Sequence, residues 1–193
     1  MAQRLDDAAL RQLFLEARTH RAWLPIEVPD AVLLELVDLM KWGPTASNTL
    51  PARIVFVRSR PAKERLRPLL AEGNRERTML APACAIIGYD AKFYEHPPKG
   101  QDPMPGFAQN PSGAETAAMR NSSLQGGYFV LAARALGLDA GPMSGFDNAG
   151  VDKEFFAGTE VKSNFLCNLG YGNPPKLRPR GPRFAFTEMA SII

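Results

Sequence analysis

Gly141-Pro-Met-Ser-Gly-Phe-Asp147 is the stretch of sequence that says most about the fold. Two glycines and a proline within five residues predict a tight bend, where the backbone comes close to whatever lies beside it. The stretch follows the longest predicted helix, Glu115–Leu136, and precedes a second amphipathic segment. Taken alone it is typical of an ordinary loop, so its meaning depends on the rest of the chain.

The predicted helix Glu115–Leu136 carries apolar residues at helical spacing and almost no long charged side chain along its middle. Such a helix is expected to be buried on most sides, either in the core or at a subunit interface. The spaced apolar residues are Leu124, Tyr128, Leu131 and Ala135, and small residues (Ala117, Ala118, Gly126, Gly127, Ala132 and Ala133) cover much of the rest.

Helices outnumber strands in the remaining sequence and do not alternate with them regularly, which favours an α+β fold over a doubly wound one. Apolar periodicity, helix-start prolines and β-branched runs define these elements. We predict helices over 5–19, from Pro29-Asp30 to Gly43-Pro44, and over 61–71, and strands over Arg53–Arg58, Ala83–Tyr89 and Asn164–Gly170. The strand Ala83–Tyr89 is apolar on both faces, as a buried strand is.

Two segments interrupt this pattern within what we take to be one domain, 1–193. Residues 91–113 contain Pro97-Pro98 and further prolines and glycines, which is typical of a long mobile excursion that covers a substrate, or of a disordered insertion. Residues 172–193 are rich in proline and have no helical period, which predicts an extended C-terminal arm.

Composition excludes several classes of protein. The 193 residues are 45% apolar, and no run approaches the ~20 apolar residues of a membrane span. The charged N-terminus does not resemble a signal peptide, so we expect a cytoplasmic protein without a membrane partner. A net charge of +3 is too small to indicate a nucleic-acid partner. The cluster Lys176, Arg178, Arg180 and Arg183 suits a phosphate group, or is a solvated tail.

Metal and nucleophile chemistry lack support in the sequence. Cys84 and Cys167 each lie in an apolar run, which predicts buried, inert thiols. There is no CxxC, and His20 and His96 lie far apart in sequence, so no metal site is expected. GxGxxG, GxxxxGK[ST] and GxSxG are all absent, which leaves no sign of a Rossmann, Walker or nucleophile-elbow site.

Several separated segments could each contribute to an anionic planar cofactor. Arg18 could hold a phosphate, with His20 and Arg21 nearby, and the turn 44–48 offers a hydroxyl and an amide. Asn74 follows a glycine between charged segments. Lys176 and Arg178 alternate along the extended arm, so both side chains point to the same face.

The order of these segments resembles the nitroreductase family over nearly the whole chain. Five motifs carry the resemblance: Arg18-Thr-His20 (Arg-x-Ser in the family), Gly43-Pro-Thr-Ala-Ser-Asn48 (Pro-Ser-x-x-Asn), Gly73-Asn74 (Gly-Asn), Gly141–Asp147 (Pro-x-Glu-Gly-Phe) and Lys176-x-Arg178 (Lys-x-Arg).

Within the family, the chain is most similar to the branch that reduces malonic semialdehyde in bacterial uracil degradation. The strings that match are Ala-Arg-Thr-His (17–20), Met-Lys-Trp-Gly-Pro-Thr (40–45), Pro-Ala-Arg-Ile-Val-Phe (51–56), Arg-Asn-Ser-Ser (120–123), Ala-Leu-Gly-Leu-Asp (135–139) and 141–147.

The resemblance implies an α+β nitroreductase-like fold with a central, mostly antiparallel sheet flanked by helices. It also implies an FMN-dependent homodimer with the flavin at the subunit interface and NAD(P)H as electron donor. Hydride transfer occurs at flavin N5, so no side chain is assigned as catalytic and no metal is needed. The implied cofactor contacts are Arg18, Thr19, His20, Pro44, Thr45, Asn48, Asn74, Pro142, Met143, Ser144, Gly145, Lys176 and Arg178, with Thr45 and Asn48 reaching across from the partner.

Three positions depart from the family pattern: Ser144 replaces a common Glu, His20 a Ser, and Leu50 a Gln. Backbone contacts survive such changes, whereas side-chain tuning of the flavin need not. The first hypothesis is reduction of malonic semialdehyde to 3-hydroxypropionate in pyrimidine degradation. The alternatives are a broad-specificity nitro or quinone reductase and a flavin-binding protein without turnover. The choice between NADH and NADPH, and the residue that binds a substrate carboxylate, stay open.

Overall fold

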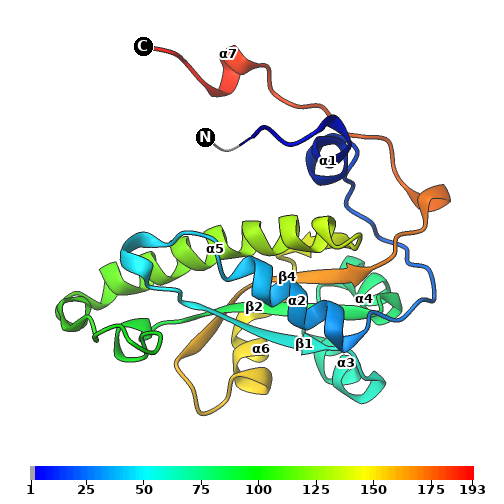
Figure 1. Cartoon of the computed structure of the whole chain (residues 1–193). Coiled ribbons are helices and arrows are strands. Elements are labelled where there is room, and N and C mark those ends of the chain that lie inside the picture. The colour runs from blue at the N-terminus through cyan, green and yellow to red at the C-terminus, as the bar shows by residue number, and fades with distance from the viewer. Residues whose placement is uncertain (1–2) are drawn as a thin grey trace.

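The computed structural model describes residues 3–193 and is built around one four-stranded sheet (Figure 1). The strand order is β1-β2-β4-β3, and every neighbouring pair is antiparallel. This confirms the predicted α+β class and the antiparallel sheet. The strands are β1 (Ala52–Val57), β2 (Ala83–Asp90), β3 (Asp139–Met143) and β4 (Val161–Gly170).

Strand β2 lies in the interior of the sheet and is buried along its whole length. Successive side chains of a strand point to opposite faces of a sheet. Ala85 and Ile87 therefore pack into one apolar cluster, while Cys84 and Ile86 pack into another on the opposite face. The continuous apolar run thus forms a strand with a helical layer on both sides, as predicted.

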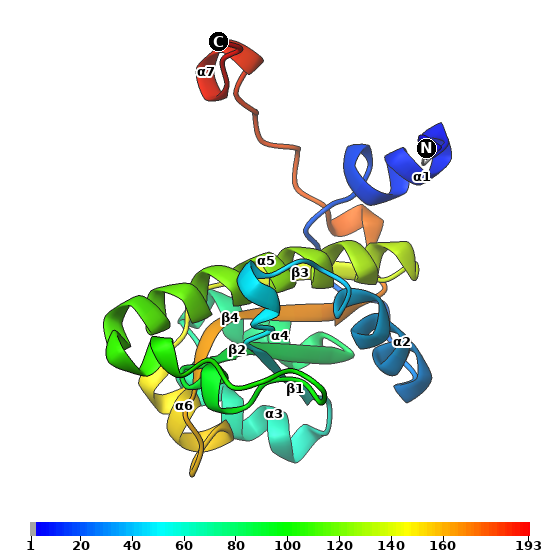
Figure 2. The ribbon, with the colours of Figure 1, turned by 60° about the vertical axis from the view of Figure 1, so that its left-hand side comes forward.

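Two helices, α2 (Asp30–Met40) and α5 (Pro111–Ala135), cover the first face (Figure 2). Pro29 precedes the first helical residue of α2, and Leu33, Leu36 and Met40 are its buried residues. Helix α5 begins four residues before the predicted start.

Among the described residues, no helix is both long and apolar enough to cross a membrane.

The early start of α5 has a local cause. The side chain of Asn110 accepts a hydrogen bond from the Gly113 backbone nitrogen at 3.0 Å, and Pro111 occupies the first helical position. An asparagine cap followed by proline stabilises a helix start, because it satisfies a free N–H group and fixes φ.

One side of α5 is buried in this chain and the other is largely open. Phe129 and Ala133 pack into the core, whereas Leu124 and Tyr128 are 49% and 40% exposed. Met119, on the same helix, is also exposed. Of the two alternatives for this helix, a single chain shows the core contact, and the subunit interface stays a prediction.

The opposite face is covered by α3 (Arg60–Leu66) and α6 (Asn148–Phe155), while α4 (Glu72–Leu80) packs against α3. The sequence pattern did not predict α4. Its polar composition and its glycine in the first turn are typical of a loop, although the buried side chain of Thr78 ties it to the body.

The Gly141–Asp147 stretch is only partly the bend that was predicted. Its first half forms edge strand β3, in which Pro142 pairs in register with Cys167 of β4. An edge strand tolerates proline, because its missing N–H group can lie on the unpaired side. The bend begins only after Met143.

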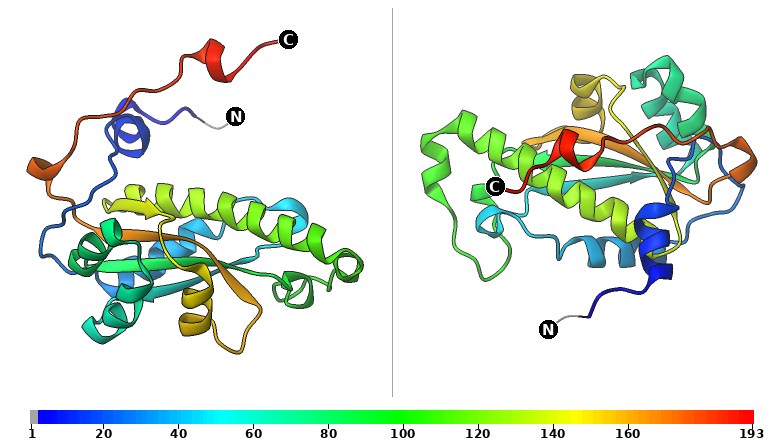
Figure 3. Two further views of the ribbon diagram at one scale, coloured as in Figure 1. Left: turned by 180° about the vertical axis from the view of Figure 1, so that it is seen from behind. Right: turned by 90° about the horizontal axis from the view of Figure 1, so that it is seen from above.

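Both ends of the chain project from the body on the side of α5 (Figure 3). The N-terminal helix is shorter than predicted: α1 (Asp7–Leu10) runs into a π-helical turn, η1 (Arg11–Leu15), which ends before Thr19. Its apolar residues are only partly covered, since Phe14 is 51% exposed while Leu10 and Leu13 are half-buried. After β4 come the short turn η6 (Pro174–Lys176) and helix α7 (Phe186–Met189), and residues 178–193 are all exposed.

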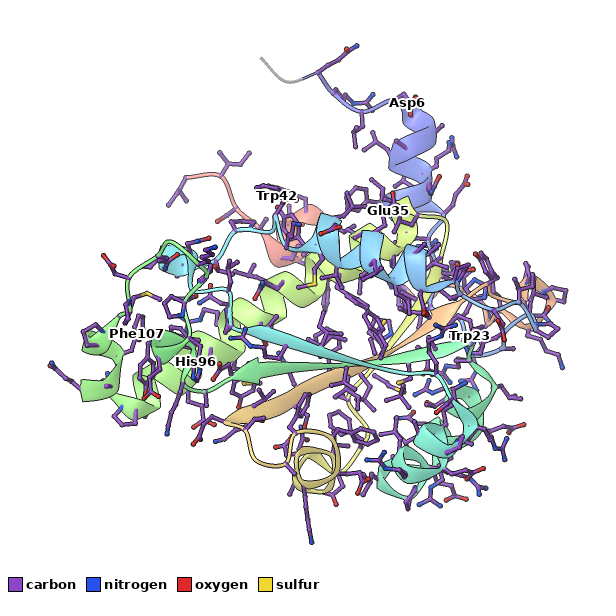
Figure 4. All side chains as sticks on the ribbon, turned by 60° about the horizontal axis from the view of Figure 1, so that its bottom comes forward. Asp6, Trp23, Glu35, Trp42, His96 and Phe107 are labelled. Atoms are coloured by element: carbon purple, nitrogen blue, oxygen red, sulfur yellow. The ribbon has the colours of Figure 1, made fainter. Side chains whose placement is uncertain are left out.

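The excursion after β2 contains two short 3-10 turns, η4 (Phe93–Glu95) and η5 (Pro105–Gln109). The rings of Phe93 and Phe107 meet edge to face with centroids 4.9 Å apart, and Tyr94 packs beside both. Figure 4 shows Phe107 and His96 together at this end of the molecule. The two limbs of the excursion thus share a small aromatic core.

Candidate functional site

A hollow rich in positive charge lies at the C-terminal end of α5, and is lined by the segment after η1 and the arm after β4. Its volume is about 450 Å³. Its lining includes no aspartate or glutamate among residues 3–193. We call it the cationic hollow, and its basic residues are Arg18, Arg21, Arg134, Lys176, Arg178, Arg180 and Arg183.

Backbone pairing brings the two basic motifs of the hollow together. Thr19 forms a parallel bridge with Ala140 of β3, which fixes the chain around Arg18. The Arg18 guanidinium Nη2 then donates to the Arg178 carbonyl at 2.5 Å. The structure therefore unites Arg18, Thr19, Lys176 and Arg178, which lie about 160 residues apart in sequence.

His20 lies behind the hollow and does not line it. Its ring is buried, with Nε2 3.3 Å from Asp139 Oδ1. The Gly172 nitrogen donates to the other oxygen of Asp139 at 2.8 Å, and a Cβ on Gly172 would lie 1.9 Å from His20 Nδ1. The geometry indicates that His20 fastens β3, the N-terminal segment and the arm to one another.

Two further arginines hold the N-terminal helix against the body. Arg134 Nη1 donates to the Leu13 carbonyl at 2.9 Å, and Arg180 Nη2 donates to the Leu15 carbonyl at 2.7 Å. A cation at the carbonyl end of a helix is stabilising. The Nε of Arg134 is buried and has no hydrogen-bond partner among the residues that the structure describes.

Asn74 and the loop after β3 form one hydrogen-bonded unit. The Gly145 carbonyl accepts from the Ala71 nitrogen at 3.0 Å and from Asn74 Nδ2 at 2.7 Å. A Cβ on Gly145 would lie 2.8 Å from Asn74 Nδ2, so only glycine fits there without displacing the amide. Ser144 beside it is exposed, and Pro142 is exposed in the same stretch.

Met143, by contrast, points into the core. It is buried, and the Thr78 hydroxyl donates to its sulfur at 3.7 Å. Of the predicted stretch 142–145, the side chain of Met143 therefore contributes packing, while its neighbours remain open to solvent.

Arg77 joins the Asn74 unit to the cationic hollow, and sequence reasoning missed it. Its guanidinium donates to Asn74 Oδ1. Burial lowers the pKa of Arg77, and the nearby charges of Arg21 and Arg178 lower it further, so three cations gather here. The i, i+3 spacing from Asn74 would have revealed Arg77, had α4 been predicted as a helix.

The turn 44–48 lies against the N-terminal half of α5, away from the cationic hollow, and has a strained backbone. Ser47, Asn48 and Leu50 have φ values of 51°, 54° and 41°, in the left-handed region that favours glycine. Non-glycine residues hold such conformations only where the surrounding structure enforces them, and these sites are frequently functional.

Two internal hydrogen bonds enforce this turn. The side chain of Asn121 on α5 accepts from the Ala46 nitrogen at 2.8 Å, and the Thr45 hydroxyl accepts from the Leu50 nitrogen at 3.1 Å. Asn121 is itself buried. The long helix thus carries the turn directly.

The predicted site residues therefore fall into two groups on one chain. Arg134 lies thirteen positions after Asn121 on α5, which corresponds to about 20 Å along a helix. Pro44, Thr45 and Asn48 consequently lie far from Arg18 and Arg178. A cofactor site that used both groups would need a second copy of the chain.

Comparison with known proteins gives consistent results. The family model described as "Nitroreductase family" matches residues 15–171. A protein of Burkholderia lata, provisionally named NADH dehydrogenase/NAD(P)H nitroreductase, is 59% identical over 191 residues, covering 97% of this chain and 98% of its own. A relative of Stenotrophomonas maltophilia with the same provisional name is 58% identical over 195 residues, with 100% of both chains covered.

Solved structures share the fold at low sequence identity. A nitroreductase structure from Bacillus subtilis has a TM-score of 0.86 at 22% identity, covering 97% of this chain and 100% of its own. A nitroreductase from Exiguobacterium sibiricum, solved in complex with FMN, has a TM-score of 0.83 at 18% identity, with both chains fully covered. The fold is therefore nitroreductase-like, and the family match over most of the chain shows that this protein belongs to the nitroreductase family.

Proposed function

We propose that the protein is an FMN-dependent NAD(P)H oxidoreductase that reduces malonic semialdehyde to 3-hydroxypropionate. The observation that carries the proposal is the carboxylate-free cationic hollow beside the Asn74–Gly145 unit. The relatives' names, which include NAD(P)H nitroreductase, and the FMN complex of the Exiguobacterium sibiricum protein support the reaction class.

The residues present fit FMN. Its phosphate needs cations and no competing carboxylate, which the hollow supplies through Arg18, Lys176 and Arg178. Asn74 offers a second amide hydrogen, because only one is used on Gly145.

The remaining predicted contacts would come from two copies of the chain. In this proposal the backbone and small side chains of 142–145 would hold the isoalloxazine. Pro44, Thr45 and Asn48 reach it from a second copy of the chain, and His20 acts through Asp139 to hold the phosphate motifs in place.

The chemistry that FMN supplies when bound is hydride transfer, from NAD(P)H to the flavin and then to the substrate carbonyl. The chain itself would bind the cofactor, orient the substrate beside it and shield both from water. Gly145 permits close approach, since it lacks a side chain above the Asn74 amide. Arg77 places positive charge next to Asn74, where it would stabilise a negatively charged reduced cofactor.

A homodimer completes this site. The outer side of α5 exposes Leu124 and Tyr128, and the nearby Trp42 is 79% exposed. Exposed apolar residues that gather in this way favour an interaction site. We assign it to a second copy, which would also bring the turn 44–48 of one chain to the hollow of the other.

The substrate class follows from an unpaired cation near this turn. Arg120 is exposed and makes none of the ion pairs found among the described residues, and it directly precedes Asn121, which holds the turn. The other cations at this end are mostly paired, for example Lys162 with Glu115 at 2.7 Å. We therefore assign Arg120 to the substrate carboxylate.

Stopped-flow spectroscopy tests the proposal. The purified protein should be yellow, should bleach with NADH or NADPH under anaerobic conditions, and should reoxidise with malonic semialdehyde. Arg120→Gln should raise the KM for malonic semialdehyde about tenfold or more, as expected for a lost charged hydrogen bond, and should leave a neutral aldehyde unaffected.

The alternatives give different traces. Rapid reoxidation by quinones or nitroaromatics with none by the aldehyde would indicate the broad reductase instead. A yellow protein that NAD(P)H does not bleach would indicate a flavin-binding protein without turnover, and would overturn the proposal.

A further inference from the structure

The tip of the excursion, residues 97–103, is fastened to the body of the protein through one side chain. Gln101 Oε1 accepts from Asn48 Nδ2 at 2.8 Å, and Gln101 Nε2 donates to the Ser47 carbonyl at 3.3 Å. Both partners lie in the strained turn at the N-terminal half of α5, which Figure 3 shows beside the excursion. Gln101 Nε2 also lies 3.9 Å from the Met104 sulfur, and the Gln101 backbone nitrogen donates to the Pro98 carbonyl within the tip.

The base of the excursion is anchored quite differently. Phe93, Tyr94 and Phe107 form the aromatic core described above, and the His96 ring lies 3.0 Å from the buried carboxylate of Asp90. These contacts do not depend on Gln101. A loss of the Gln101 contacts would therefore free the tip and leave the base in place.

The partner of Gln101 is itself part of the predicted cofactor site. Ser47 and Asn48 are held at positive φ, and Gln101 adds a third tie to those from Asn121 and Thr45. Strained backbone relaxes when a restraint is removed. The position of the tip and the shape of the turn are consequently coupled.

We propose that Gln101 is a specificity-determining residue: by fastening the excursion tip to the turn 44–48, it closes the substrate space to all but small substrates. The inference rests on the proposed function, in which this turn borders the cofactor of a second copy. A released tip admits bulky acceptors, and the closed tip favours a three-carbon aldehyde.

Limited proteolysis tests the fastening without any need for activity. The tip contains one tryptic site, the exposed Lys99 followed by Gly100. Gln101→Ala removes both hydrogen bonds to the turn, together with the weak contact to the Met104 sulfur. Cleavage after Lys99 should therefore accelerate about tenfold, since proteolysis follows the population of the open form. Gln101→Glu keeps the acceptor for Asn48 but loses the donor to Ser47. Its cleavage rate should lie between those of Gln101→Ala and the unmodified protein.

A matched control separates this effect from a general loosening of the segment. Gln109 is an exposed glutamine of the same excursion that makes neither contact to the turn. Gln109→Ala should digest like the unmodified protein. Equal cleavage rates for Gln101→Ala and the unmodified holoprotein would overturn the fastening.

Steady-state kinetics tests the specificity. In Gln101→Ala the ratio of kcat/KM for a bulky quinone to kcat/KM for malonic semialdehyde should rise about tenfold, in line with the opening of the tip. Faster cleavage with an unchanged ratio would overturn the role in specificity. If the unmodified protein reduces neither substrate, the proposed function fails and the specificity role with it, while the proteolysis still decides whether Gln101 holds the tip.

Discussion

The two ends of α5 present the same helix to two different kinds of site. At the C-terminal end, the cationic hollow gathers seven basic side chains from distant segments. At the N-terminal end, the turn 44–48 is held by uncharged side chains and by a backbone in an uncommon conformation. We therefore expect the cationic hollow to act through its positive charge, and the turn 44–48 through its backbone conformation.

This difference determines how each end responds to change. Charge acts over several ångströms, so the hollow should tolerate small displacements of its side chains. The turn depends on hydrogen bonds that fail within about half an ångström. Removal of one cation should lower the affinity of the hollow for an anion only in part. Removal of one hydrogen bond from the turn should change the conformation of the whole turn.

The largest expected effect comes from blocking the proposed dimer, in which the turn 44–48 of one copy would meet the cationic hollow of the other. Gly127 lies on the outer face of α5, and a Cβ added there meets nothing within 4 Å. Gly127→Leu should therefore leave the single chain folded but should block close approach of a second copy. Light scattering should show a lower dimer fraction, and the ratio of flavin to protein absorbance should fall with it.

Neighbouring Gly126 provides the opposite control. A Cβ there would lie 2.5 Å from the ring of Phe165, so Gly126→Ala should destabilise the fold by about 1–3 kcal/mol in denaturant unfolding. A monomeric unmodified protein, or a Gly127→Leu dimer that keeps its full flavin content, would show that the two ends do not combine across an interface.

The second prediction concerns the hollow alone. Arg178→Ala removes a cation that Arg18 holds in position, and should weaken FMN binding by about 1.5–3 kcal/mol, or roughly 10- to 150-fold in Kd. Arg183 lines the same hollow but donates to its own arm at Gly181 and Pro182. Equal losses for Arg183→Ala and Arg178→Ala in a flavin titration would mean that overall charge, rather than the Lys-x-Arg motif, holds the phosphate.

The smallest expected effect tests the core that both ends share. Burial raises the pKa of Cys167 to about 12, from about 9 in an exposed thiol. The folded state therefore keeps the proton to higher pH than the unfolded state, and stability that is present below pH 9 is lost as the pH rises toward 12.

The free energy of unfolding falls as the pH rises, and in Cys167→Ala this fall should be smaller by about 1–2 kcal/mol between pH 8 and pH 10.5. Urea unfolding at the two pH values measures it. The pKa of Cys84 and that of Tyr89 are raised as well, so part of the loss should remain. An identical pH dependence in the variant would show that Cys167 titrates alike in both states.

Local signals in the sequence were sufficient for much of the fold. The all-apolar run of β2 and the amphipathic pattern of α2 each identified an element and its buried face. Strand β3 was missed because Pro142 is unfavourable in a strand unless the strand lies at an edge, and edge position is a property of the whole sheet. The open face at Leu124 was left between two alternatives, because periodicity does not distinguish a core from an interface.

The site was predictable to the extent that it depends on residue type. Arg18, Lys176 and Arg178 were identified as basic residues, and the structure brings them together. Pairing between distant side chains was beyond the sequence pattern. His20 with Asp139, and Gln101 with Asn48, arise only after the sheet and the excursion have folded.

Helix α5 also sets the relative orientation of the two ends, and this has a consequence for how the family can vary. Each residue of an α-helix advances about 1.5 Å and turns about 100°. A single deletion between Asn121 and Arg134 would therefore rotate the restraint on the turn by more than a quarter of a circle relative to the Leu13 contact of Arg134. We expect natural changes in length to accumulate in the excursion tip and the arm, while the stretch between Asn121 and Arg134 keeps a constant number of residues.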